Sequence, residues 1–472
     1  MLQTIEAVNS AVNNFIWGVP AMICIIGVGL YLSIRTRFLQ IRKFPYAIKT
    51  TIGRVFRKRE ASDGAMTPFQ AVCTALAATV GTGNIAGVAG AIAIGGPGAV
   101  FWMWISAALG MCTKFSEVTL AVHFRETNAR GELIGGPMYY IKNGLGKNWR
   151  WLAALFSLFG VLTVFGTGNA TQVNTITTAI NSALLNYHLI NEDAVSTSNL
   201  IIGIIIAILV ATVLLGGVKR IGRVTEKLVP FMALIYIVLS LGVILLNLNR
   251  VPFVFASIVE GAFSPASVTG GVVGSFFLSM KKGVSRGIFS NESGLGSAPI
   301  AAAAAQTKEP VRQGLISMTG TFLDTIIVCT MTGLVLVITG AWSNPELSGA
   351  SVTNYAFAQG LGTSIGATIV TVGLLFFAFT TILGWCYYGE RCFLYLVGIR
   401  GIKVYRFVFI VLVGAGSFLT LDLIWILADI VNGLMAFPNL VALIGLRKEI
   451  ISETKDYFER LKATQHDQDE LA

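Results

Sequence analysis

A long apolar segment, roughly residues 68–93, is interrupted by the stretch TVGTGNIAG (79–87), where a continuous membrane helix would be expected. Glycine is a poor helix former and permits unusual backbone angles, so three glycines within seven residues predict that the helix opens here. In lipid, an opened backbone is tolerated only where it is buried in protein or lines a wet cavity. The rest of the chain is therefore expected to build such a cavity around this stretch.

The composition is that of a polytopic, all-α membrane protein. Hydrophobic residues make up 54% of the 472 residues and charged residues only 12%, whereas soluble domains average about 25% charged residues. A membrane helix needs about 20 apolar residues. We expect residues 268–282 to form a lead-in on the outside and 447–472 to form a polar tail. Eleven transmembrane helices are predicted, at roughly 15–34, 68–93, 98–122, 151–185, 199–216, 228–247, 283–305, 313–340, 364–388, 405–420 and 423–446.

The lysines and arginines orient these spans. Of the 34 in the chain, 29 fall in loops that a single topology places on one side, while the opposite loops 186–198 and 341–363 carry none. Loops rich in Lys and Arg stay in the cytoplasm, so we expect the N-terminus outside and the C-terminus in the cytoplasm. The net charge of +10 reflects this placement and does not indicate a nucleic-acid partner.

The architecture repeats after about 207 residues. A shift by that number places Asn84 on Asn291 and Glu117 on Asp324. Each half begins with a glycine-interrupted span and continues to a long span that carries one acid, and paired breaks of this kind point to a transporter site. Because the first half starts inside and has five spans, the second half starts outside. We therefore predict one N-terminal helix plus a 5+5 inverted repeat with broken first and sixth core helices, divided into 1–64 (N-terminal helix and basic loop), 65–250 (first repeat), 251–448 (second repeat) and 449–472 (cytoplasmic tail).

A broken membrane helix can bind a zwitterion and a cation together. It offers free N–H groups at the start of its second half and free carbonyls at the end of its first half, with partial positive and partial negative charge respectively. A carboxylate suits the first of these ends, and an ammonium group or Na⁺ suits the second. Gly83, Gly87 and Gly90 would also suit close helix packing, but packing alone does not explain Thr82 and Asn84.

Four further intramembrane residues are candidates, each with a structural alternative. The hydroxyls of Thr380 and Thr381 could coordinate Na⁺ or could bond helix carbonyls of the preceding turn. Gln172 could bind a substrate or link two helices. Trp385 could wall the pocket or pack in the core.

Three motifs resemble the alanine/glycine:cation symporter family: GTGNIAGVA (81–89), GGPMYY (135–140) and RGIFSNESGLGSAP (286–299). The resemblance extends over about residues 15–446. It implies uptake of alanine or glycine with Na⁺, or with H⁺ in some members, across a prokaryotic plasma (inner) membrane. It also implies the fold of the bacterial leucine transporter, an inverted repeat with broken helices.

The resemblance also implies the site. The Val-Gly-x-Gly-Asn break of the leucine transporter matches residues 80–84, and its paired hydroxyls match 380–381. The implied Na⁺ ligands are the carbonyls of Ala77, Val80 and Phe377 and the hydroxyls of Thr380 and Thr381. The substrate carboxylate would meet amides near 82–84, and its amino group would meet carbonyls near 289–291. The candidate substrate-binding residues are Thr79, Thr82, Gly83, Asn84, Gln172, Phe289, Ser290, Asn291, Thr381 and Trp385.

The sequence favours transport over catalysis. It has no Ser-His-Asp set, metal cluster or nucleotide loop, and its six cysteines form no CxxC pair. Two alternatives to Na⁺-driven symport stay open at this point, namely a passive channel or facilitator for a small solute and symport driven by H⁺. No cofactor and no obligate protein partner is indicated besides the lipid bilayer.

Overall fold

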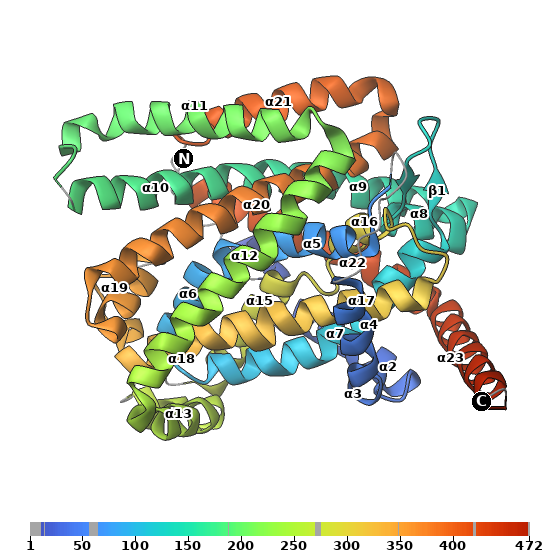
Figure 1. The fold of residues 1–472 in the computed structure, drawn as a ribbon, viewed down its shortest axis with the longest axis horizontal. Coiled ribbons are helices and arrows are strands. Elements are labelled where there is room, and N and C mark those ends of the chain that lie inside the picture. The colour runs from blue at the N-terminus through green and yellow to red at the C-terminus, as the bar shows by residue number, and fades with distance from the viewer. Residues whose placement is uncertain are drawn as a thin grey trace.

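The computed structural model describes residues 11–13, 15–55, 65–186, 188–269, 275–347, 349–418 and 422–470. Residues 56–64 of the predicted basic loop therefore lie outside the described residues. Nearly all of the described secondary structure is helical, as expected (Figure 1). The exception is one antiparallel hairpin, β1 (Glu126–Thr127) with β2 (Leu133–Ile134), in which Glu126 is opposite Ile134.

Within the described residues, six helices are long and apolar enough to cross a membrane, or up to eight spans if each of two bent helix pairs is one span. A multi-pass membrane protein is thus confirmed, whereas the count of eleven and the repeat stay predictions. The long helices are α7 (Ala99–His123), α9 (Arg150–Phe165) continuing into α10 (Thr171–Asn186), α11 (Val195–Leu214), α12 (Gly217–Leu246), α17 (Pro310–Thr321) continuing into α18 (Thr330–Thr339), and α20 (Ser364–Val397).

The first interruption lies where the glycines predict it. Helix α5 (Pro68–Thr79) begins with a capping box between Thr67 and Gln70. A π-helical turn, Gly83–Gly87, and α6 (Val88–Gly95) then continue the chain at an angle of 50° to α5. The 79–87 stretch thus divides one apolar segment into two half-helices.

The second interruption separates α15 (Phe276–Asn291) from α16 (Ala298–Ala302). Three residues between them have left-handed backbone angles, namely Glu292 (φ 56°), Gly294 (φ 93°) and Gly296 (φ 83°). Helix α15 begins at Phe276, within the 268–282 segment expected as a lead-in and seven residues before the predicted broken span, so the helix starts earlier than predicted. Lys282 is accommodated there against Gly95, whose missing side chain leaves room for the lysine Cβ.

Several helices lie outside the predicted spans. They are α3 (Leu39–Arg42), α4 (Phe44–Val55), α8 (Pro137–Tyr140), α13 (Val251–Phe263), α14 (Pro265–Thr269), α19 (Ala350–Leu361) and α23 (Arg447–Glu470). The segment predicted as a polar tail is therefore helical over most of its length. His123 Nδ1 on α7 contacts Glu453 Oε1 on α23 at 3.0 Å, and Arg460 contacts Glu309, so this helix is attached to the bundle. The remaining helices are α2 (Val19–Arg35), α21 (Ile402–Ala415) and α22 (Asp422–Gly445).

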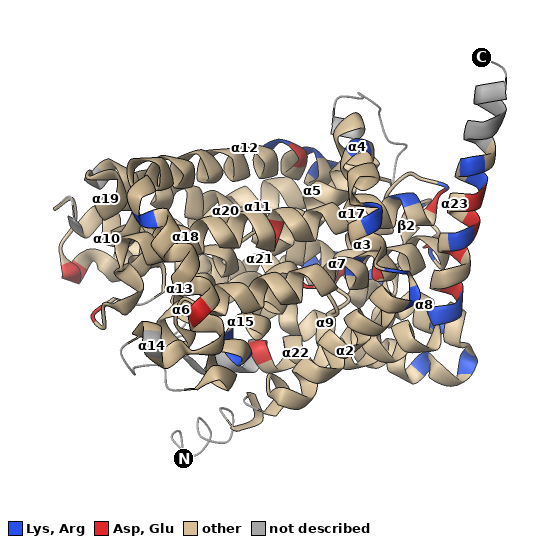
Figure 2. Cartoon of the chain, turned by 90° about the horizontal axis from the view of Figure 1, so that it is seen from below, with Lys and Arg blue, Asp and Glu red and all other residues tan. Residues whose placement is uncertain are grey.

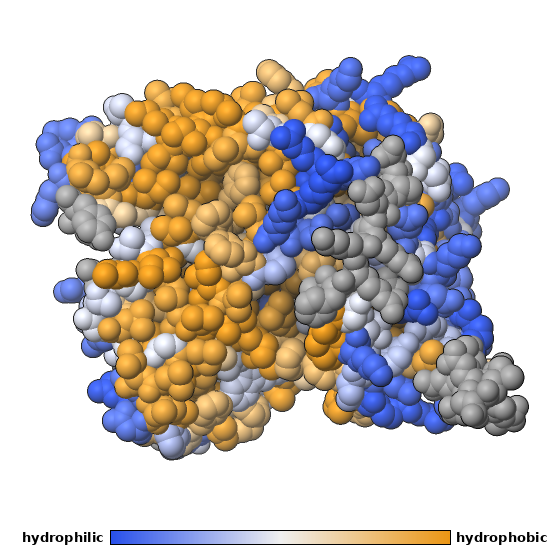
Figure 3. Space-filling view, in the orientation of Figure 1, coloured by the Kyte–Doolittle hydropathy of each residue, from blue (hydrophilic) through white to orange (hydrophobic). Residues whose placement is uncertain are grey.

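Charge and hydropathy divide the molecule along the direction of its long helices. Many Lys and Arg residues lie at the end formed by α4, α8 and α23 (Figure 2). In the view of Figure 3, apolar side chains cover the centre and left of the surface, and hydrophilic ones gather toward the right. Exposed large apolar residues such as Leu234 and Phe407 contribute to this surface. Such an apolar surface suits a helix bundle in lipid. Lipid offers no water to hydrogen-bond the backbone, and the helices satisfy their backbone groups internally.

Close packing of α15 on α7 yields a stability prediction. A Cβ on Gly283 would lie 2.3 Å from the Ala99 carbonyl oxygen and 2.6 Å from Trp102 Cβ. We expect Gly283→Ala to force these helices apart and to cost about 1–3 kcal/mol, which thermal unfolding of the purified protein would detect. Gly27→Ala in α2 is the matched control, because nothing lies within 4 Å of its added Cβ. Equal melting temperatures for the two variants would contradict the inference that Gly283 is required for close packing of α15 on α7.

Candidate functional site

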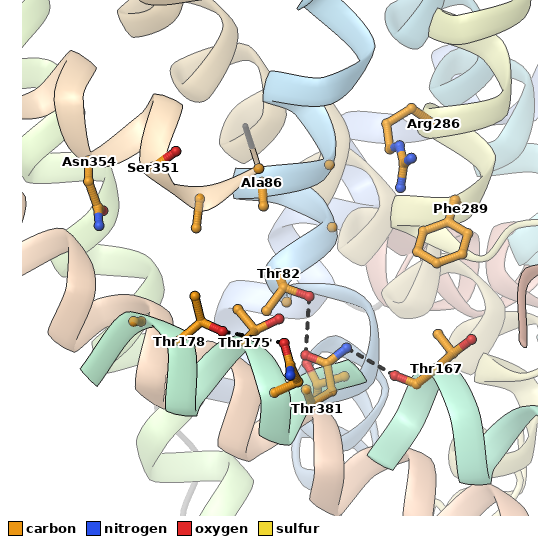
Figure 4. Close-up of a pocket in the computed structure, with 18 of the residues that line it drawn as sticks. Thr82, Ala86, Thr167, Thr175, Thr178, Arg286, Phe289, Ser351, Asn354 and Thr381 are labelled. Carbon is orange, nitrogen blue, oxygen red and sulfur yellow. Dashed lines mark hydrogen bonds between the residues drawn. The ribbon is translucent and has the colours of Figure 1, made fainter. Parts of the chain in front are cut away.

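A cavity of about 880 Å³ lies between the two broken helices and helices α10, α19 and α20 (Figure 4). In Figure 4, Arg286 and Phe289 lie on one side of it, Ser351 and Asn354 on the other, and Thr82 near its floor. The sequence predicts a cavity around the first break, and the structure has one there.

The first break leaves two backbone carbonyls without their regular donors. In an α-helix the Gly81 N–H would bond the Ala77 carbonyl, and the Asn84 N–H would bond the Val80 carbonyl. Here the Gly81 N–H donates to Asn84 Oδ1 at 2.9 Å, and the Asn84 N–H donates to the Gly81 carbonyl at 3.2 Å. Val80 itself is extended, with φ −79° and ψ 91°. The carbonyls of Ala77 and Val80 thus lose these two donors.

Of the paired threonines of α20, Thr381 lies beside this break, while the Thr380 hydroxyl contacts Met232 Sδ of α12 at 3.5 Å. A Cβ on Gly81 would come within 2.5 Å of Thr381 Oγ1, so the approach of α20 requires glycine at this position. The Thr381 hydroxyl donates to the Phe377 carbonyl at 2.8 Å, and the Thr380 hydroxyl lies 3.0 Å from the same carbonyl. A hydroxyl that donates its hydrogen keeps two lone pairs, so both oxygens can still accept a cation.

Gln172 joins two walls of the cavity. Its Oε1 accepts from the Thr82 hydroxyl at 3.1 Å, and its Nε2 donates to the Thr167 carbonyl at 3.0 Å. Thr167 belongs to a π-helical turn, Gly166–Ala170, between α9 and α10. Trp385 packs against the same turn, since a Cβ on Gly168 would lie 2.3 Å from Trp385 Cβ. Gln172 therefore serves as a link between helices while it lines the cavity.

The end of α15 closes the opposite wall. The Phe289 ring lies against the first break, 3.7 Å from the position of a Cβ on Gly83. The Arg286 guanidinium lies over that ring, 5.0 Å from its centroid. Residues of both breaks, Gly83 and Phe289, therefore line the same cavity.

The structure brings most of the candidate substrate-binding residues to the cavity wall, but not all of them. Asn84, Ser290 and Asn291 are buried and are not among the lining residues. The Asn84 carboxamide donates instead to Asp324 Oδ1 at 2.7 Å and to Ser290 Oγ at 2.8 Å. Thr79, Thr82, Gly83, Gln172, Phe289, Thr381 and Trp385 line the cavity.

Sequence reasoning missed a polar stripe on α10. Asn174, Thr175, Thr178 and Ser182 line the cavity, and their spacing of one, three and four residues places them on one helix face. This helical spacing is visible in the sequence and was the available signal. The lining residues on α19, Ser351 and Asn354, lie in a stretch predicted to be a loop, so no such signal existed there.

Comparison with known proteins identifies the chain. The model of the sodium:alanine symporter family matches residues 2–471. An uncharacterized transporter of Haemophilus influenzae is 62% identical over 470 residues, 99% of each chain. The sodium/alanine symporter AgcS of Methanococcus maripaludis is 45% identical over 455 residues, 95% of this chain and 96% of that protein. The chain belongs to the sodium:alanine symporter family. The predicted family membership is thereby confirmed.

Membership of the sodium:alanine symporter family makes the chain a transporter and not an enzyme, of a family of amino acid/cation symporters. The probable sodium/glutamine symporter GlnT of Bacillus subtilis is 37% identical over 466 residues, 98% of this chain and 93% of that protein. A solved manganese transporter of Eremococcus coleocola aligns over 82% of this chain and 79% of its own, at 14% identity and a TM-score of 0.46.

Proposed function

We propose that this protein is a secondary active symporter that imports alanine or glycine with Na⁺. The observation that carries the proposal is that the first break opens beside the Thr381 hydroxyl. The Ala77 and Val80 carbonyls lose their helical donors, and the Thr381 hydroxyl, which donates to the Phe377 carbonyl, lies against the neighbouring Gly81. With Thr380, these are the oxygens proposed to bind Na⁺, which takes oxygen ligands.

The substrate occupies the cavity between the two breaks in this proposal. Its carboxylate meets backbone amides near Thr82 and Gly83, where the second half-helix begins and the peptide dipoles favour negative charge. Its ammonium group meets the carbonyls at the end of α15, near Phe289. The presence of Thr82, Gly83 and Phe289 in the wall of one cavity supports this pose.

Sodium binding pre-orders the first break and so raises substrate affinity, and by linkage the substrate raises sodium affinity equally. The helices that carry both breaks then move against the scaffold in alternating access, within a 5+5 inverted repeat.

The cavity extends to α19, in the region predicted to lie outside, which supports an outward-facing state. The placement of Lys and Arg supports an outside N-terminus and a cytoplasmic C-terminus in a prokaryotic plasma membrane.

Uptake into liposomes tests the proposal. We expect purified protein to accumulate radiolabelled alanine or glycine above equilibrium when an inward Na⁺ gradient is imposed, and not when Na⁺ is equal on both sides. Serine serves as a third substrate, and Li⁺ and an acid-only gradient serve as alternative driving ions. Equilibration without accumulation would identify a facilitator, and accumulation driven by acid alone would replace Na⁺ with H⁺.

A further inference from the structure

One buried carboxylate contacts both broken helices. Asp324 lies in the π-helical segment Phe322–Cys329, between α17 and α18, and its side chain is fully buried. Asp324 Oδ1 accepts from Asn84 Nδ2 at 2.7 Å, which belongs to the first break. Asp324 Oδ2 accepts from Ser290 Oγ at 2.7 Å, which belongs to the end of α15. The proposed transport function assigns no role to this residue.

The contact with Asn84 extends to the proposed cation ligands. The Asn84 side chain donates through Nδ2 to Asp324 and accepts through Oδ1 from the Gly81 N–H at 2.9 Å. This Gly81 N–H is the group that would otherwise bond the Ala77 carbonyl. Asp324 thus fixes the orientation of the side chain that holds the Ala77 carbonyl free.

The contact with Ser290 extends to the other end of the substrate. Ser290 follows Phe289 in the last turn of α15, where the carbonyls proposed for the ammonium group lie. Asn84 Nδ2 also donates to Ser290 Oγ at 2.8 Å, so Asn84, Ser290 and Asp324 form a closed triangle of hydrogen bonds. Movement at either break therefore strains the other through this triangle.

The cost of the carboxylate argues that it is more than a packing residue. An ionisable group inside a membrane protein is expensive and marks a functional position by default. A third donor, the Thr325 hydroxyl at 2.7 Å from Oδ2, helps to satisfy its lone pairs. The Asn84 amide and the two hydroxyls all donate to the carboxylate, which suits an ionised acceptor whose orientation is fixed from three helical segments.

We propose that Asp324 is a positioning residue that couples sodium binding at the first break to substrate binding at the second. The inference rests on the proposed symport function and adds the physical link between the two ligands. Asp324 touches neither ligand. It acts by holding Asn84 and Ser290 in one geometry, so that ordering of the first break by Na⁺ also orders the end of α15.

The test measures the coupling factor, defined as the ratio of alanine dissociation constants without and with saturating Na⁺, on purified full-length protein. Asp324→Asn keeps an acceptor for Asn84 but replaces Oδ2 by a donor that cannot accept from Ser290. We expect the coupling factor to fall at least fivefold in Asp324→Asn and in Ser290→Ala. The control is Ser240→Ala in α12, a fully buried serine whose hydroxyl donates to the Tyr236 carbonyl of the same helix at 2.8 Å, and its coupling factor should match the wild type.

The double variant Asp324→Asn/Ser290→Ala tests whether the two residues affect coupling through one shared hydrogen bond or independently of each other. If Asp324 and Ser290 act through one hydrogen bond, the double variant loses little more coupling than either single variant. A wild-type coupling factor in Asp324→Asn, or in Ser290→Ala if the first variant does not fold, would overturn the inference. Absence of any sodium effect on the wild type would instead refute the proposed function, so the two failures are distinguishable.

Discussion

Gly81→Ala is expected to remove most sodium-driven uptake while leaving the protein folded. The added Cβ would lie 2.5 Å from Thr381 Oγ1, which is one of the proposed sodium ligands. Relief of such a contact costs about 1–3 kcal/mol, which is a factor of roughly 5 to 150 in an equilibrium constant. Because either Thr381 or the backbone at Gly81 has to move, this cost falls on the sodium site.

The measurement is the sodium concentration that gives half-maximal alanine uptake in liposomes. We expect it to rise by one to two orders of magnitude in Gly81→Ala, in line with that cost. Gly90→Ala is the control, since it lies on α6 after the same break and nothing lies within 4 Å of its added Cβ. A similar sodium dependence in the two variants would show that the contact between Gly81 and Thr381 is not part of the sodium site.

The position of the first break could be predicted because it is a local property. Glycines at 81, 83 and 87 weaken the helix whatever packs around them, and the structure bends within this stretch. The proximity of Thr381 could not be derived in that way, because 300 residues separate it from Gly81. It came from the resemblance to a family, and the structure places the two residues in contact range.

The orientation of Asn84 shows where sequence reasoning ends. A polar residue beside two glycines in a membrane helix predicts a polar contact, and the substrate was the expected partner. The structure gives Asn84 other partners, Asp324 and Ser290, which lie more than 200 residues away. Side-chain orientation depends on such distant neighbours, and no pattern around position 84 encodes them.

The start of α15 was misplaced for a related reason. A helix that begins at Phe276 includes Lys281 and Lys282, whose charges are costly inside a membrane. Long lysine side chains can extend their apolar stems along a packed surface while the charge reaches a polar region. Lys282 Cβ packs against Gly95 of the other broken helix, a contact that a charge count cannot anticipate.

The loss of a single hydroxyl is expected to have the second large effect. Thr381→Val keeps the shape of the side chain and removes an oxygen proposed to bind Na⁺. An interaction between a polar group and a charge contributes about 1.5–3 kcal/mol, so sodium affinity should fall roughly 10- to 150-fold. Maximal uptake at saturating Na⁺ should change far less, because the valine fits the same space.

A matched substitution on the cavity wall isolates the effect of sodium. Thr175→Val removes a hydroxyl that also lines the cavity and bonds its own helix, at 2.8 Å from the Thr171 carbonyl, but lies outside the proposed cation ligands. We expect its sodium dependence to match the wild type. If Thr381→Val and Thr175→Val respond alike, the hydroxyl of Thr381 is not a cation ligand, and the cation has to bind elsewhere. If only the sodium dependence of Thr381→Val shifts, the result supports the Thr381 hydroxyl as a cation ligand, because both substitutions remove one hydroxyl from the cavity wall.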